Sequence, residues 1–116
     1  MYVVTAASRP PERRPPPLPT LQRLVDGTTG STTTTILINK LAPDERVPAH
    51  VHDVEEILLV TAGRCEVAAG GFVVEVAAGD AVVVPADETH AFRQIGTGRA
   101  AVTAILASPN PTFSWL

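Results

Sequence analysis

The 116-residue sequence has a single cysteine, Cys65, and no long run of apolar residues. One cysteine cannot form an internal disulfide, which excludes a secreted disulfide scaffold and a zinc module built on clustered cysteines. The apolar runs fall short of the roughly 20 residues that a membrane helix needs, and residues 1–25 lack the pattern of a signal peptide. We therefore expect a cytoplasmic protein with no membrane partner, in which Cys65 is a small core residue.

Aromatic and basic residues are also scarce. The chain has three Phe, one Trp and one Tyr, and its formal net charge is -3. The positive charge gathers in residues 1–23, where Arg9, Arg13, Arg14 and Arg23 face one acid, and the remainder is acidic. Without a basic stripe or a stacking platform, nucleic acid is not an expected partner.

Length and hydrophobic content predict one folded domain preceded by an arm. Residues 9–19 read RPPERRPPPLP, so neither a helix nor a central strand can form there. We assign residues 1–20 to a proline-rich N-terminal arm and residues 21–116 to the domain. A surface tether is the favoured interpretation of the arm, and a polyproline ligand for an aromatic groove is the alternative.

The domain is predicted to be all-β. No sustained 3.6-residue periodicity occurs after Leu21, whereas short β-branched and apolar runs recur between turn signals. The spacing of these strands suggests a sandwich or a small barrel, with a tight hairpin turn at Gly70–Gly71. The expected strands are Leu21–Asp26, Thr32–Leu41, Glu56–Thr61, Arg64–Ala69, Phe72–Val76, Ala81–Val84, Ala91–Ile95 and Ala100–Ala107.

Two of these strands are apolar on both faces. Residues 57–60 and 82–84 contain only Ile, Leu and Val, which is typical of strands covered on both sides. A chain this small has few residues left to cover the second face of these strands. A homodimer is therefore our hypothesis.

The residues with most chemical promise are three histidines and a glutamate. His50 and His52 share one face of an extended strand, Glu56 has the same parity, and His90 lies on a later strand. Three imidazoles and one carboxylate suit a divalent transition metal such as Fe(II), Mn(II), Zn(II), Ni(II) or Cu(II). Glu55 competes with Glu56 for this role, but parity favours Glu56.

The frame around these residues resembles the cupin family. Residues 44–63, DERVPAHVHDVEEILLVTAG, resemble the first cupin motif G(X)5HXH(X)3,4E(X)6G, with Gly63 in register. Residues 79–94, GDAVVVPADETHAFRQ, resemble the second motif G(X)5PXG(X)2H(X)3N. Asp44 and Asp87 replace motif glycines, and Asp tolerates the turn conformations that glycine supplies. Gln94 replaces the closing Asn.

The resemblance implies a cupin double-stranded β-sandwich barrel of jelly-roll type, with the metal inside near one mouth. His50, His52, Glu56 and His90 would be its ligands. By parity with these ligands, Leu58, Val60, Phe92 and Gln94 would line a mostly apolar cavity for a small-molecule substrate.

The implied function is that of a metal-dependent enzyme acting on a small, mostly apolar oxygenated molecule, in keeping with bacterial secondary metabolism. The sequence leaves open an Fe(II) dioxygenase and a Lewis-acid cyclase, isomerase or decarboxylase. A non-catalytic cupin module that binds a small molecule or a metal is the alternative. A structural dimer with an empty cavity is a third possibility.

Overall fold

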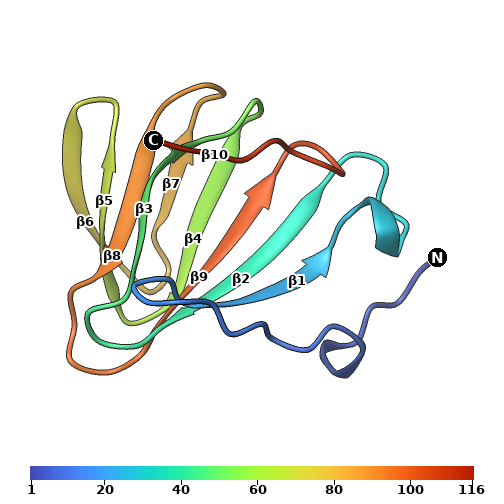
Figure 1. Ribbon diagram of the computed structural model, residues 1–116, viewed down its shortest axis with the longest axis horizontal. Coiled ribbons are helices and arrows are strands. Elements are labelled where there is room, and N and C mark those ends of the chain that lie inside the picture. Colours follow the sequence, from blue (N-terminus) through green and yellow to red (C-terminus); the bar gives the residue numbers. More distant parts are fainter.

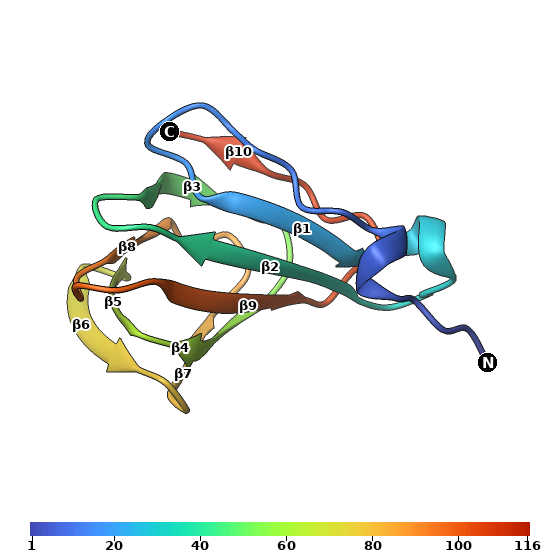
Figure 2. The ribbon, with the colours of Figure 1, turned by 90° about the horizontal axis from the view of Figure 1, so that it is seen from below.

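The computed structural model describes residues 1–116, which form two antiparallel sheets packed face to face (Figures 1 and 2). One sheet has the order β1-β2-β9-β4-β7 and the other β10-β3-β8-β5-β6, which confirms the predicted all-β jelly-roll sandwich. Neither short helix has the length and apolar content of a membrane span. The elements are η1 (Ala6–Ser8), β1 (Thr20–Val25), η2 (Gly27–Thr29), β2 (Thr35–Leu41), β3 (Arg46–Val51), β4 (Glu56–Ala62), β5 (Arg64–Ala69), β6 (Phe72–Ala77), β7 (Ala81–Val84), β8 (His90–Gln94), β9 (Ala100–Leu106) and β10 (Ser114–Trp115).

The predicted strands are present, two of them with the expected bounds, but the prediction missed β3 and β10. β3 contains a proline, which argues against a strand, and β10 is two residues long and forms by pairing with β3. β2 begins at Thr35 and not at Thr32, because the Ser31 hydroxyl accepts hydrogen bonds from the amides of Thr33 and Thr34 and holds that segment in a bend.

Turns that need a positive φ carry residues that tolerate it. Gly70 and Gly71, with φ of 58° and 79°, form the predicted tight hairpin turn between β5 and β6. Asp44 and Asp87 have φ of 69° and 66°, so each adopts the left-handed conformation that glycine would adopt in the family motifs. The prediction that these two substitutions preserve the backbone is therefore confirmed.

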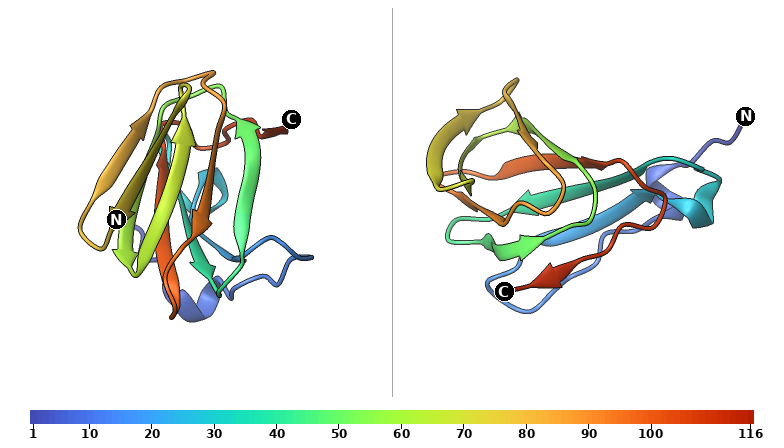
Figure 3. Two further views of the ribbon diagram at one scale, coloured as in Figure 1. Left: turned by 90° about the vertical axis from the view of Figure 1, so that its left-hand side faces the viewer. Right: turned by 90° about the horizontal axis from the view of Figure 1, so that it is seen from above.

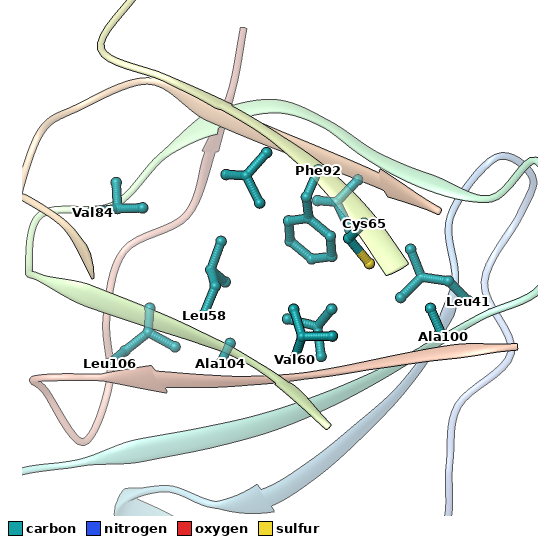
Figure 4. Close-up of a cluster of buried hydrophobic side chains, with 12 residues drawn as sticks. Leu41, Leu58, Val60, Cys65, Val84, Phe92, Ala100, Ala104 and Leu106 are labelled. Atoms are coloured by element: carbon teal, nitrogen blue, oxygen red, sulfur yellow. The ribbon is translucent and has the colours of Figure 1, made fainter. Parts of the chain in front are cut away.

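The hydrophobic core fills the middle of the sandwich. β4 and β9 alternate strictly between buried and half-buried or exposed positions over most of their length, so one face of each points inward. Leu58 and Val60 of β4 meet Phe92 and Cys65 from the opposite sheet (Figure 4). At one end of this core the buried side chains become polar, and the candidate site lies there.

The proline-rich arm runs beside β1 (Figure 2). Glu12 and Leu21 exchange two backbone hydrogen bonds, and the Pro17 carbonyl accepts one from the amide of Arg46. Pro19 is fully buried. The arm is thus attached to both sheets of the sandwich, at the start of β1 and the start of β3.

Candidate metal centre

His50 points into the sandwich because β3 contains a bulge. Val47 pairs with Phe92 and His50 pairs with His90, so β3 uses one residue more than β8 over this stretch. Strict alternation from the buried Val47 would turn His50 outward, and the extra residue reverses its direction. His50 is only 2% exposed as a result.

The other three residues arrive from separate elements. Glu56 begins β4 in the facing sheet and is 3% exposed, whereas Glu55 beside it is exposed. His52 lies just after β3, and His90 begins β8. All four potential ligand atoms lie within 4.8 Å of one another.

Each imidazole is oriented through its Nδ1 atom. The Nδ1–H groups donate to backbone carbonyls: His50 to Pro48 at 2.8 Å, His90 to Glu88 at 2.9 Å and His52 to Thr112 at 2.7 Å. Since a carbonyl can only accept, each ring carries its proton on Nδ1 and presents the Nε2 atom to the site. This is the usual orientation of a metal-binding histidine.

The Nε2 atoms and the Glu56 carboxylate fit a cation. His90 Nε2 lies 2.6 Å from Glu56 Oε1, and His52 Nε2 lies 3.4 Å from Glu56 Oε2. His52 Nε2 is buried and has no hydrogen-bond partner. Electron pairs this close need a positive charge between them, and three imidazoles with one carboxylate suit a divalent transition metal. The cluster is a candidate site for such a metal.

The ionisation of the site follows from its burial. Burial lowers the pKa of His50 to about 4, with the Pro48 carbonyl opposing this effect. Burial would raise the pKa of Glu56, but the imidazoles of His52 and His90 outweigh it and lower that pKa to about 2. For His52, burial is outweighed by the Glu56 carboxylate and the Thr112 carbonyl, so its pKa is raised. Glu56 is therefore anionic at neutral pH and His50 is neutral.

The metal site opens into a cavity of about 380 Å³. The C-terminal segment forms one wall, because it returns to pair with β3 (Figure 3). Phe113 stacks on the His50 ring with centroids 4.6 Å apart and an interplanar angle of 9°. The cavity is lined by Arg14, Leu18, Leu21, Arg23, Leu37, Asn39, Val47, His50, His52, Glu56, Phe92, Ala104, Phe113 and Trp115.

The predicted substrate contacts divide between the cavity and the rest of the barrel. Phe92 lines the cavity. Leu58 and Val60 point inward as predicted, but they are 1% exposed and belong to the core. Gln94 lies at the far end of β8, where its amide donates to the Gly98 carbonyl, so it is not part of the cavity next to the metal ligands.

Sequence reasoning missed Arg14, Asn39, Phe113 and Trp115, which also line the cavity. The arm and the C-terminal segment lie outside both motifs, and their composition does not indicate where they dock. The one available signal was the presence of Phe113 and Trp115 in a chain with few aromatics.

Comparisons with known proteins agree with the fold and the motifs. The family model described as "Cupin domain" matches residues 37–106, so this chain belongs to the cupin family. A search of curated protein sequences found no match.

The chain is similar in structure to several solved proteins. The polyketide cyclase RemF from Streptomyces resistomycificus is 22% identical with a TM-score of 0.78, over 100% of this chain and 87% of that one. A predicted oxalate decarboxylase from Thermotoga maritima is 22% identical with a TM-score of 0.80, over 91% and 98%. The oxalate decarboxylase from Lactobacillus farciminis is 18% identical with a TM-score of 0.85; the match covers 95% of this chain and 34% of that one. At these identities the likeness establishes the fold.

Proposed function

We propose that this chain is a metal-dependent cupin enzyme that acts on a small, mostly apolar oxygenated molecule. His50, His52, Glu56 and His90 would hold one divalent metal at the inner end of the cavity. The observation that carries this proposal is the convergence of three Nε2 atoms, each fixed by a backbone carbonyl on the other ring nitrogen, on one buried carboxylate.

The cavity offers no other group for acid–base catalysis. Apart from the proposed ligands His50, His52 and Glu56, its ionisable lining residues are the arginines Arg14 and Arg23, which stay protonated. The remaining lining is mainly apolar and would exclude water from a bound substrate. Chemistry in this cavity therefore depends on the metal, while the chain binds and orients the substrate.

A divalent metal held by four residues could supply either dioxygen activation, if it is Fe(II), or Lewis-acid polarisation of a carbonyl, if it is Zn(II), Ni(II) or Mn(II). Structural relatives named oxalate decarboxylase, oxalate oxidase and polyketide cyclase suggest that one fold can serve several reactions. The alternative proposal is a non-catalytic module that binds a metal or a small molecule. A cytoplasmic location stays a prediction.

Turnover separates these proposals. The protein is loaded with Fe(II), Zn(II), Ni(II) or Mn(II) in turn and incubated with a panel of small aromatic and aliphatic oxygenated compounds. Oxygen uptake with Fe(II) alone supports the dioxygenase, and product formation without oxygen uptake supports Lewis-acid chemistry. Absence of turnover with every metal contradicts the enzyme proposal and favours the binding module.

We also propose that the chain is a homodimer. Phe72, Val73 and Val74 of β6 and Val83 of β7 are 77%, 62%, 45% and 59% exposed, and both strands lie at sheet edges. Exposed apolar edges of this kind are prone to pair with another chain. Sedimentation equilibrium should give the dimer mass, and a monomer mass independent of concentration would contradict the proposal.

A further inference from the structure

The proline-rich arm contributes an arginine to the cavity beside the metal site. Arg14 and Leu18 of the arm line the same cavity as His50, His52 and Glu56. The Arg14 guanidinium is held in place by two hydrogen bonds, from Nε to the Pro19 carbonyl at 2.9 Å and from Nη2 to Asn39 Oδ1 at 3.1 Å. Both acceptors are uncharged.

Arg14 differs in this respect from four arginines that form ion pairs with carboxylates. Arg9, Arg23, Arg64 and Arg93 each lie 3.0 to 3.2 Å from a carboxylate oxygen. Arg14 has no carboxylate within that range, and its remaining N–H groups have no protein acceptor. Partial burial lowers its pKa and Arg23 adds to the effect, while the carboxylates of Glu12 and Glu45, which do not contact Arg14, oppose it. A partly buried guanidinium that no carboxylate contacts favours binding of an anion.

The charges around the cavity point to a single negative charge on the ligand. Arg23 already pairs with Glu12 at 3.2 Å, and Glu56 belongs to the metal cluster, so Arg14 is the one lining arginine that forms no ion pair. One unpaired guanidinium balances one carboxylate, and its planar fork matches a carboxylate in geometry. A phosphate monoester, with its higher charge, would need a second cation.

The rest of the cavity suits an apolar body attached to that carboxylate. Phe92, Phe113 and Trp115 line it together with leucine side chains, and its volume is about 380 Å³. We infer that the ligand of this site is a small carboxylate with an aromatic or compact apolar body, whose carboxylate is bound by Arg14. The inference rests on the proposed function for the location of the site and adds the substrate class.

Binding of two probes of equal shape tests the inference. Benzoate and its neutral counterpart benzamide are titrated into zinc-loaded protein, and into protein treated with a chelator. The readout is the indole N–H signal of Trp115 in NMR spectra, since Trp115 is the single tryptophan and lines the cavity. The metal-free titration removes any attraction between the carboxylate and the metal.

The variants are Arg14→Gln and, as a matched control, Arg13→Gln, because Arg13 is exposed on the same arm and does not line the cavity. We expect the wild type, both zinc-loaded and metal-free, to bind benzoate more tightly than benzamide. Arg14→Gln should weaken benzoate binding by about 10- to 100-fold in both forms, the usual range for a hydrogen bond between charged groups, and should leave benzamide binding and zinc content unchanged. Arg13→Gln should bind both probes as the wild type does.

Benzoate binding that is unchanged in Arg14→Gln, or equal affinity of the metal-free wild type for both probes, would overturn the inference. Either result would leave the metal-dependent function standing if the protein still takes up zinc. Conversely, a protein that binds no metal but keeps an Arg14-dependent preference for benzoate would support the inference while contradicting the proposed metal chemistry.

Discussion

Acid should destabilise the metal-free protein through His50. This ring is 2% exposed, and burial lowers its pKa to about 4 in the folded state, compared with 6.5 for an exposed histidine. Between these two pH values the unfolded chain binds a proton at this ring and the folded chain does not. The free energy of unfolding therefore falls as the pH falls from 6.5 to 4, by about 1.4 kcal/mol per pH unit.

The interval from pH 6.5 to 5 isolates this effect, with an expected loss of about 2 kcal/mol. The lowered pKa of Glu56, about 2, has its effect only below the ordinary value of 4.5. The raised pKa of His52 has the opposite sign: its contribution is complete below pH 6.5 and is lost as the pH rises through the folded-state value.

The assay is urea denaturation of chelator-treated protein at pH 6.5, 5.75 and 5.0, for the wild type and for His50→Gln, which cannot titrate at this position. The wild type should lose stability across the series, and the variant should lose about 2 kcal/mol less. Equal losses in the two proteins, or no loss in the wild type, would refute the argument that His50 is buried as a neutral ring.

Three further substitutions test the architecture around the site. Gly63→Ala should destabilise the protein by about 1–3 kcal/mol in urea denaturation, because Gly63 has φ of 72° and an added Cβ would lie 2.7 Å from the Arg99 carbonyl; wild-type stability would contradict this. Leu58→Ala should lower the free energy of unfolding by about 2–5 kcal/mol, because it truncates a core side chain, and should leave ligand affinity nearly unchanged. A change in affinity at normal stability would show that Leu58 contacts the substrate. Phe113→Ala should raise the pKa of His50 towards 6.5 in NMR titrations of metal-free protein, because loss of the stacked phenyl ring exposes the imidazole to water. An unchanged pKa would show that Phe113 does not shield the ring.

Residue spacing was sufficient to predict the cluster of His50, His52, Glu56 and His90, because both motifs combine residue type with position. Parity also separated the buried Glu56 from the exposed Glu55. It could not reveal the bulge in β3, which depends on pairing with β8. His50 was thus correctly predicted to point inward, although the prediction did not include the bulge that turns it inward.

Parity shows which face of a strand a side chain is on, but not how far along the barrel it lies. Gln94 and His90 have the same parity on β8, but four residues of strand separate them by about 13 Å. Gln94 therefore lies beyond Phe92, away from the metal ligands. Neither could parity place Arg14, because the arm's position depends on backbone contacts with Leu21 and Arg46 that have no local sequence signal.

The metal content of the purified protein tests the central claim most directly. Wild-type protein, purified without added metal or a metal-affinity tag, is compared by elemental analysis with Glu56→Gln and with the adjacent control Glu55→Gln. We predict close to one transition-metal ion per chain in the wild type and in Glu55→Gln, and a large loss in Glu56→Gln. A wild type without metal, or a loss in Glu55→Gln with full retention in Glu56→Gln, would contradict it.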